Sequence, residues 1–261
     1  MPPNKLTGKH ILFIGGSTGL GLAAAREALS SGTKVTLASS SQDKLNRALK
    51  DLSSDNPEGQ THSLVIDLLR PDIEHALNEL RTAAMEVHGP INHIVYTAGD
   101  WFPHVPLTDI TENNFVQGAR LRALVPMLLA KQVAQGAWLP RSRSSSLTFT
   151  GGNISQKPTP GFLLPAFIGA GMEGAVRAMA LELAPIRVNI VAPGFVDTEL
   201  WGEMRGLLAE RQEGRVLTGK AGQAEDVAEA YLYLVKDGNI TGQVIRSEGG
   251  AMLLSQESRG R

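Results

Sequence analysis

A glycine-rich turn directly follows the first apolar run of the sequence. Residues 11–14 are all apolar, and the next seven residues are Gly15-Gly16-Ser17-Thr18-Gly19-Leu20-Gly21. Glycines allow a tight turn and a close approach to the backbone, and a helix that begins here directs unpaired N–H groups at an anion. This turn between a strand and a helix predicts a dinucleotide-binding βα unit, the alternative being a strand-to-helix turn without a ligand.

Short apolar runs alternate with longer segments of helical period along the chain, which is typical of repeated βα units. The expected strands are residues 11–14, 35–38, 63–67, 93–97, 146–150, 188–191 and 243–245. The expected helices are residues 20–31, 42–52, 71–87, 113–135, 169–183, 198–212 and 224–236. We predict an α/β protein with a single domain over residues 1–261. Its Rossmann fold would be a doubly wound, parallel, seven-stranded sheet with helices on both faces.

Composition argues against several classes of protein. The 25 basic and 26 acidic side chains nearly cancel, so the chain lacks the positive field that nucleic acids or anionic membranes attract. Without cysteine there are no disulfides, thiolate metal sites or cysteine nucleophiles, and the six histidines show no metal spacing. The first residues are too polar for a signal peptide, and no apolar run is long enough to span a bilayer. We expect a cytoplasmic protein that acts on a small molecule, with no metal, nucleic-acid or membrane partner.

Several motifs together are similar to those of the short-chain dehydrogenase/reductase family, and the resemblance covers almost the whole chain. The motifs are the Gly-x-x-x-Gly-x-Gly turn, Thr97-Ala98-Gly99 with Thr97 in place of the family's Asn, residues 180–198 around the sixth strand, and Glu248-Gly249-Gly250. The resemblance implies a nicotinamide cofactor and a homodimer or homotetramer. The implied cofactor-binding residues are Gly15, Ser17, Thr18, Gly19, Leu20, Ser39, Ser40, Ser41, Asp67, Leu68, Ala98, Gly99, Pro193, Gly194, Val196 and Thr198.

The end of the second expected strand bears on the choice of cofactor. An acidic side chain there would accept hydrogen bonds from the ribose of NAD and repel the additional phosphate of NADP. This chain has Ser39, Ser40 and Ser41, with no carboxylate before Asp43. The serines favour NADP(H), although the arginine often present in NADP-binding relatives is missing and a plain solvated turn is the alternative.

Motif spacing also locates the family's catalytic positions. In the family a Tyr protonates the carbonyl oxygen, a Lys four residues later lowers the pKa of that Tyr, a Ser steadies the oxygen and an Asn completes a proton relay. Here these positions fall on Pro165, Gly169, Gly152 and Arg122, respectively. None of the three tyrosines lies between Gly152 and Glu182. The sequence therefore predicts a site that works without a tyrosine acid.

Further motifs resemble a divergent fungal group of the family. They are Ser39-Ser40-Ser41, Arg122, Ser155-Gln156-Lys157-Pro158-Thr159-Pro160 and Asp197-Thr198-Glu199-Leu200-Trp201. The group includes bifunctional iminium reductases and Diels–Alderases of bicyclic indole alkaloid pathways such as those of malbrancheamide and paraherquamide. Hydride transfer to an iminium cation gives a neutral amine and needs no acid, and an intramolecular cyclisation needs mainly a shaped cavity. The resemblance implies an enzyme of secondary metabolism that performs either reaction or both.

Candidate substrate residues follow from the rule that ligands of open α/β sheets bind outside the carboxyl ends of the strands. The expected pocket residues are Trp101, Phe102, Gly152, Asn153, Pro165 and Trp201, and the candidate catalytic side chains are Arg122 and Asp100. Arg122 suits an anion or a carbonyl group, and Asp100 suits a cation. The alternatives are core or subunit packing for the two tryptophans, a solvated loop carboxylate for Asp100 and a structural partner for Arg122.

Two other functions are compatible with the same residues. One is a non-catalytic NADP(H)-sensing or scaffold protein, because empty sites also arise when selection for turnover ends. The other is a catalytically silent subunit of a larger oligomer. Apolar residues on the expected helices 113–135 and 169–183 that suit such an interface are Leu121, Leu124, Met127, Leu128, Val176, Met179 and Leu183.

Overall fold

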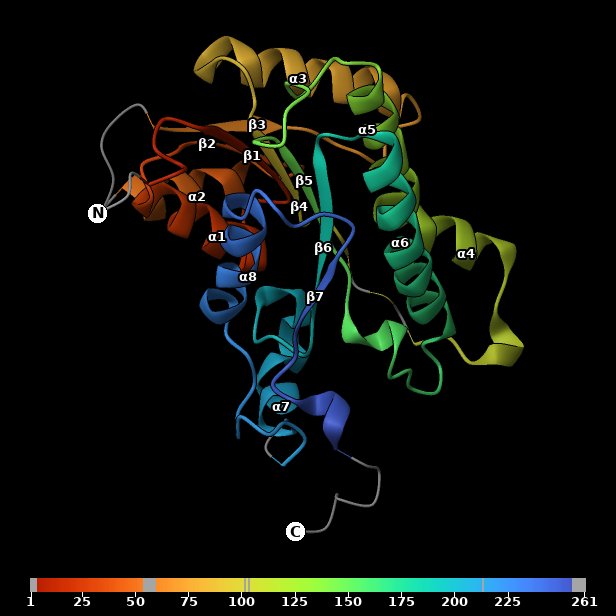
Figure 1. Cartoon of the computed structure of the whole chain (residues 1–261). Helices are drawn as coiled ribbons and strands as arrows, with labels where there is room; N and C mark the ends of the chain where they lie inside the picture. Colours follow the sequence, from red (N-terminus) through yellow and green to blue (C-terminus); the bar gives the residue numbers. More distant parts are fainter. Residues whose placement is uncertain (1–3, 54–59, 101, 103, 213, 255–261) are drawn as a thin grey trace.

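The fold is built on one sheet of seven parallel strands in the order β3-β2-β1-β4-β5-β6-β7 (Figure 1). The computed structural model describes residues 4–53, 60–100, 102, 104–212 and 214–254. The strands are β1 (His10–Ile14), β2 (Lys34–Ser39), β3 (Thr61–Val65), β4 (His93–Tyr96), β5 (Ser146–Thr150), β6 (Arg187–Pro193) and β7 (Val244–Ser247). Their order runs outward in both directions from β1 and β4, which confirms the predicted doubly wound sheet.

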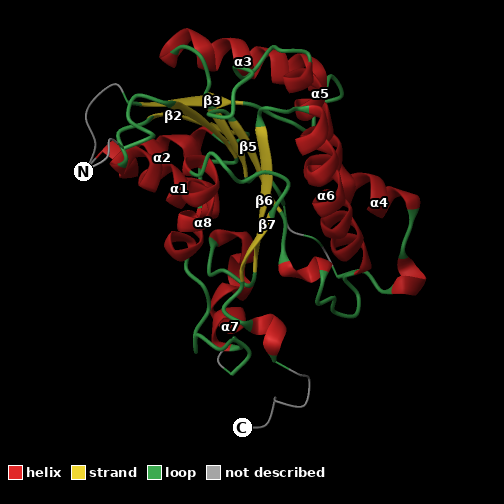
Figure 2. Ribbon diagram, in the orientation of Figure 1, coloured by secondary structure: helices red, strands yellow, loops and turns green. Residues whose placement is uncertain are grey.

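Helices cover both faces of the sheet (Figure 2). One face carries α1 (Gly19–Ser30), α2 (Gln42–Ser53) and α8 (Ala224–Lys236), and the other carries α3 (Ile73–His88), α5 (Val125–Ala134) and α6 (Leu163–Glu182). α4 (Glu112–Ala119) packs on α6, and the short α7 (Arg205–Glu210) lies beyond the carboxyl ends of the strands. In the described residues no helix combines the length and the apolar character needed to cross a bilayer.

In strand β1, apolar residues do not alternate with polar ones, because both faces of the strand are buried. Ile11 and Phe13 pack into the core beneath α1 and α8, whereas Leu12 and Ile14 pack into the core beneath α3, α5 and α6. Successive side chains of a strand point to opposite faces, so a strand covered on both sides needs apolar residues at every position. The carboxyl end of this buried strand is thereby fixed, and the glycine turn follows it.

The helix expected at residues 169–183 begins earlier, at Leu163. Pro165 lies in its first turn, where a backbone N–H has no intrahelical acceptor, so the proline costs no hydrogen bond. The earlier start places Pro165 and Gly169 one turn apart on the same helix. Both positions therefore face in similar directions.

The prediction of one continuous α-helix over residues 113–135 is wrong for the middle of this segment. α4 leads into a π-helical segment, η2 (Arg120–Leu124), and then into α5. The Tyr96 hydroxyl donates a hydrogen bond of 2.7 Å to the carbonyl oxygen of Leu121 inside this segment. Wide turns of this kind are frequent at functional sites, and this one carries Arg122.

The helix expected at residues 198–212 is also broken. A 3₁₀ segment, η4 (Glu199–Met204), precedes α7, and Gly202 interrupts it with φ 51° and ψ −134°. The strand bounds, in contrast, differ from the expected ones by two residues or fewer. The segment after β6 is thus an irregular cover over the end of the sheet.

Candidate functional site

A cavity of about 1050 Å³ lies at the carboxyl ends of the strands. Its lining includes residues at the ends of β1 and β4, which lead to opposite sides of the sheet, and doubly wound folds bind nucleotides at this place. Each of the sixteen cofactor-binding residues predicted from the sequence lines this cavity, from Gly15 in the first turn to Thr198 after β6. Asp100, Phe102, Arg122, Gly152, Asn153, Pro165 and Trp201 line it too, whereas Trp101 lies outside the described residues.

The glycine turn is pressed against the end of β4. A Cβ atom at Gly15, whose φ is 92°, would lie 2.4 Å from the backbone nitrogen of Ala98. A Cβ atom at Gly21 would lie 2.4 Å from Oγ1 of Thr97, which donates a hydrogen bond of 3.1 Å to the carbonyl oxygen of Gly15. Thr97 therefore joins β4 to the turn, and only glycines fit at both positions.

Helix α1 presents an open N-terminus to the cavity. Thr18 is its N-cap residue but makes no side-chain capping bond, and the first turn contains no acidic residue. The free N–H groups and the positive end of the helix dipole are suited to the pyrophosphate of a dinucleotide. These donors and the glycine turn fit a nicotinamide dinucleotide, which would supply or accept a hydride when bound.

Arg122 is held firmly at the cavity wall. Its Nη2 donates to the carbonyl oxygen of Asp100, its Nε lies 3.9 Å from Oδ1 of Asp100, and its Cζ lies 4.7 Å from the ring centroid of Phe102. A Cβ atom at Gly99 would come within 2.8 Å of that Cζ, so the glycine makes room for the guanidinium. Burial lowers the pKa of Arg122 and the Asp100 carboxylate opposes this shift. An arginine nevertheless stays protonated in proteins, so the wall carries an oriented positive charge.

The four positions that motif spacing assigns to the family's catalytic residues meet in space. Arg122, Gly152, Pro165 and Gly169 all line the same cavity, and Arg122 alone among them has a polar side chain. They come from three separate elements, namely the π segment, the turn after β5 and the first turns of α6. This convergence supports the alignment on which the predicted site depends.

The space beside Gly169 is occupied by a polar cluster behind the cavity wall. A Cβ atom at Gly169 would lie 3.4 Å from Cβ of Ser155. Ser155 donates a hydrogen bond of 2.5 Å to Oε1 of Glu173, and Glu173 forms an ion pair of 2.9 Å with Arg246 on β7. The cluster fixes the turn after β5 against α6, where it forms one side of the cavity.

No tyrosine lines the described part of the cavity. The Tyr96 hydroxyl is bonded to Leu121, and the Tyr231 hydroxyl lies 2.7 Å from Oγ1 of Thr150. Burial raises the pKa of both phenols far above their ordinary value. Tyr233 is exposed on α8. The phenols are thus structural groups or lie outside the cavity.

Aromatic rings line part of the cavity. Trp201 stacks on Phe195 with ring centroids 4.7 Å apart, and its Nε1 donates a hydrogen bond of 2.7 Å to the carbonyl oxygen of Val196. Trp201 therefore packs against other residues of the chain and also lines the cavity, so it combines the predicted pocket role with the alternative of core packing. His104 and Phe162 form an edge-to-face pair with centroids 5.5 Å apart, and both line the cavity.

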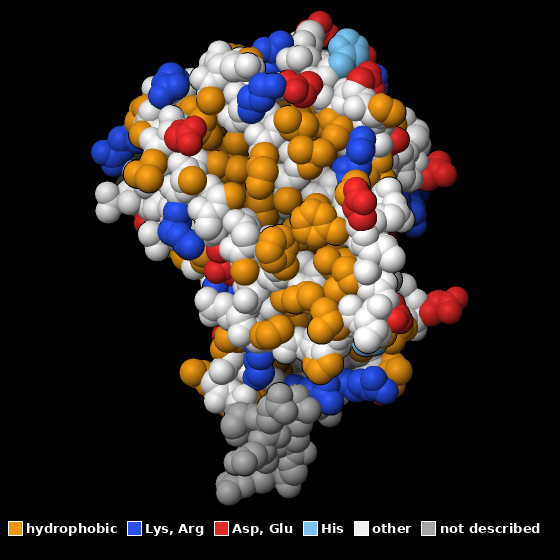
Figure 3. All heavy atoms as spheres, turned by 90° about the vertical axis from the view of Figure 1, so that its right-hand side faces the viewer, with side chains coloured by type: hydrophobic (Ala, Val, Ile, Leu, Met, Phe, Trp, Pro, Cys, Tyr) orange, Lys and Arg blue, Asp and Glu red, His pale blue; other side chains and the backbone are white. Residues whose placement is uncertain are grey.

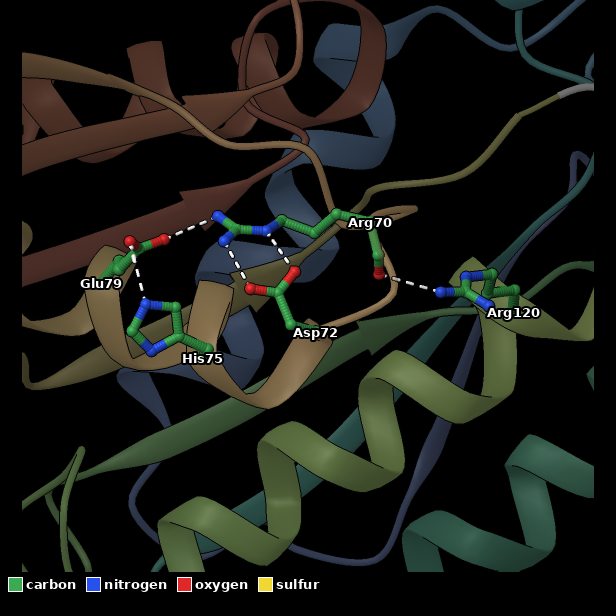
Figure 4. A network of polar contacts seen from close by, with 5 residues as sticks. All are labelled: Arg70, Asp72, His75, Glu79 and Arg120. Atoms are coloured by element: carbon green, nitrogen blue, oxygen red, sulfur yellow. Dashed lines mark hydrogen bonds and ion pairs between the residues drawn. The ribbon is translucent and has the colours of Figure 1, made fainter.

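The loop after β3 is connected to the segment that carries Arg122 (Figure 4). Arg70 donates hydrogen bonds of 2.6 Å to both carboxylate oxygens of Asp72 and one of 2.7 Å to Glu79. Arg120 donates one of 2.9 Å to the backbone carbonyl oxygen of Arg70. Leu69, directly before Arg70, lines the cavity. The network therefore links the expected adenine end of the cavity to the π segment.

The polar cavity residues that the sequence did not predict include Lys44 and His104. Lys44 lies on α2 beyond the strand end that was considered, and His104 is in a loop without a motif. Among the described residues, no group of three or more acidic, histidine or cysteine side chains has an arrangement that could hold a metal ion.

A parallel doubly wound sheet, a glycine turn at its switch point and an open helix N-terminus define a dinucleotide-binding Rossmann protein. The chain belongs to the short-chain dehydrogenase/reductase family, because the family model described as an SDR-like Rossmann domain matches residues 3–254. Members of this family are oxidoreductases that bind nicotinamide cofactors, which supports an enzymatic function for this chain.

The chain is similar to fungal members of the family. It is 38% identical to the short-chain dehydrogenase/reductase ATR9 of Stachybotrys chlorohalonatus, over 95% of this chain and 98% of that protein. It is 35% identical to fsr5 of Gibberella fujikuroi, over 96% of this chain and 97% of that protein. The solved structure of the MalC reductase/Diels-Alderase from Malbranchea aurantiaca matches with a TM-score of 0.89 and 33% identity, covering 97% of this chain and 99% of that one. The predicted resemblance to this fungal group is confirmed.

Proposed function

We propose that this chain is an NADP(H)-dependent enzyme of secondary metabolism, in an alkaloid pathway, that works without a tyrosine acid. It reduces an iminium-type substrate, guides an intramolecular cyclisation of the Diels–Alder type, or does both. One observation carries this proposal. The residues that fit a dinucleotide share a cavity with Gly152, Pro165 and Gly169, which have no side chain that could donate a proton. The likeness to the MalC reductase/Diels-Alderase supports this proposal.

The polar residues of the cavity suit such a substrate. The fixed guanidinium of Arg122 is placed to donate to a carbonyl oxygen of the substrate, and it would repel a cationic nitrogen. The carboxylate of Asp100 is 60% exposed and suits that nitrogen. Phe102 and Trp201 add aromatic surface for a polycyclic substrate. For a cyclisation, the same walls would hold the two reacting ends near one another.

The test compares two substrates with the purified chain and NADPH. We expect a cyclic iminium ion to be reduced, and a ketone of matched shape to react about 100-fold more slowly or not at all, because an alkoxide needs an acid that contributes about 10²-fold or more. The absorbance of NADPH reports the rate. Rapid ketone reduction would refute the proposal. Nucleotide-dependent binding of a partner protein, with no product from either substrate, would instead favour the sensor or scaffold function.

We also propose that the chain forms a homodimer or homotetramer through the face made by α4, η2, α5 and α6. Apolar side chains gather on the side of the molecule shown in Figure 3, and exposed ones on these elements include Phe115, Val116, Leu124, Met127 and Phe167. Val176 and Leu183, expected at such an interface, are instead buried in the core of the chain itself. Light scattering at micromolar concentration is expected to give the mass of a dimer or tetramer, and a monomer would contradict this proposal.

A further inference from the structure

The π segment η2 contains a backbone carbonyl group that the helix itself does not satisfy. In an α-helix the carbonyl oxygen of Leu121 would accept a hydrogen bond from the N–H of Val125, four residues later. That N–H instead donates to the carbonyl oxygen of Arg120, five residues before it, as in a π-helix. The π-helical partner of Leu121 would be Pro126, which has no N–H. Neither of these two helical donors therefore serves the Leu121 carbonyl.

A tyrosine of strand β4 supplies the missing donor. The Tyr96 hydroxyl donates a hydrogen bond of 2.7 Å to the carbonyl oxygen of Leu121. Tyr96 is the last residue of β4, it is buried, and its ring packs against Phe149 of β5. A polar backbone group that is buried without a partner destabilises a fold. The hydroxyl of Tyr96 therefore stabilises the π-helical form of this segment.

The chain around the end of β4 holds Arg122 at two places. Leu121 directly precedes Arg122, so the bond from Tyr96 fixes the backbone to which the guanidinium is attached. Four residues after Tyr96, the carbonyl oxygen of Asp100 accepts a hydrogen bond from Nη2 of Arg122. Leu121 and Arg122 line the cavity, whereas Tyr96 does not. An effect of Tyr96 on a bound substrate would thus be exerted through the π segment.

We propose that Tyr96 is a positioning residue for Arg122, with its hydroxyl replacing the N–H that Pro126 lacks. This inference rests on the proposed function, in which Arg122 donates to a carbonyl oxygen of the substrate. Without the hydroxyl, the π segment loses a bond that holds its wide turn against β4. Arg122 then keeps its charge but loses its fixed position, and a displacement of about 1 Å in an active site is enough to slow a reaction strongly.

The first test is a double-mutant cycle on the reduction of a cyclic iminium ion that carries a carbonyl group. We expect Tyr96→Phe, which removes only the hydroxyl, to lower the single-turnover rate about tenfold. In a chain that already contains Arg122→Ala, the same substitution is expected to change the rate less than about twofold, because the side chain that it positions is gone. A merely structural role of Tyr96 would give the same loss of rate in both chains.

Thr36→Val is a matched control for the loss of a buried hydroxyl. Oγ1 of Thr36 lies 2.9 Å from Nε2 of His10, and Thr36 is buried and does not line the cavity. We expect this variant to have a lower Tm, as Tyr96→Phe does, but a rate within about twofold of that of the unaltered chain. A tenfold loss of rate in the control would show that the rate follows stability, and would overturn the assignment of Tyr96.

The second test does not depend on activity. Pro126→Ala restores an N–H that can donate to the carbonyl oxygen of Leu121. We expect Tyr96→Phe to lower the Tm by about 3 °C in the unaltered chain and by less than about 1 °C in the Pro126→Ala chain. Equal losses of Tm in the two chains would show that the hydroxyl does not replace the missing N–H.

The outcomes separate this inference from the proposal on which it rests. If the unaltered chain forms no product, or if Arg122→Ala leaves the rate unchanged, the proposed function of Arg122 is wrong and the positioning role of Tyr96 is wrong with it. If Arg122→Ala slows the reaction but Tyr96→Phe does not, or slows it equally with and without Arg122, the assignment of Tyr96 is wrong while the proposed function stands.

Discussion

Replacing Arg122 with alanine is expected to lower product formation by about 100-fold while changing the Kd of NADPH less than about twofold. The expected size is that of removing one preorganised donor from an active site. The guanidinium is fixed by Asp100 and Phe102 before any substrate arrives, so it needs no reorientation when it donates to a carbonyl oxygen of the substrate. Its guanidinium contacts Asp100, Phe102 and Gly99, whereas the phosphates of the nucleotide are expected at the glycine turn, which is why we expect the Kd of NADPH to change much less than the rate.

Two further variants make the result specific to the Arg122 side chain. Arg122→Lys keeps the charge but loses the planar fork, so we expect only a partial rescue. Arg120→Ala removes the same charge from the same π segment, but Arg120 bonds to Arg70 and does not line the cavity. The rate of product formation is measured in single-turnover experiments, and the Kd of NADPH is measured by titration. An unchanged rate in Arg122→Ala would contradict the proposed role, and an equal loss in Arg120→Ala would show that the segment, and not the guanidinium, is responsible.

The sheet could be predicted from the sequence because burial on both faces leaves a continuous apolar run. Residues 11–14 illustrate this: the run needs no knowledge of its neighbours to be recognised as a buried strand. The helix start at Leu163 could not be predicted, since Pro165 usually marks the end of a helical pattern and is tolerated here only because it lies in the first turn. The π segment at Arg120–Leu124 also leaves no periodic signal, because it adds a single wide turn inside a continuous helix.

The residues of the site also fall into those that could be predicted from the sequence and those that could not. The glycine turn has a fixed spacing that follows from backbone sterics, and the residues expected around it do line one cavity. His104 could not be predicted, because its position depends on contact between two loops that are far apart in the sequence. The backbone nitrogen of Val105 donates a hydrogen bond of 2.9 Å to the carbonyl oxygen of Gly161. Lys44 was within reach of the sequence analysis, because the first turn of a helix after a strand end faces the same ligand as that end. Residues set by local geometry are predictable, and those set by contacts between loops are not.

Replacing Gly15 with alanine is expected to destabilise the fold by about 2–5 kcal/mol and to abolish measurable NADPH binding. A side chain at φ 92° is strained, at a cost of about 1–2 kcal/mol. The added Cβ would also lie 2.4 Å from the backbone nitrogen of Ala98, and relief of such an overlap costs about 1–3 kcal/mol more. Either β4 or the turn must move, and both line the cavity where the nucleotide is expected to bind.

Gly136 offers a matched control that separates the two costs. Its φ of 80° is similar, but a Cβ atom there would have no neighbour within 4 Å. We therefore expect Gly136→Ala to lose only the strain component, about 1–2 kcal/mol, and to bind NADPH as the unaltered chain does. Urea unfolding gives the free energies and calorimetric titration gives the affinities. Equal losses of stability in the two variants would mean that the turn moves away from Ala98 at no cost in free energy. The tight packing of Gly15 on Ala98 could then not explain why the turn requires glycine.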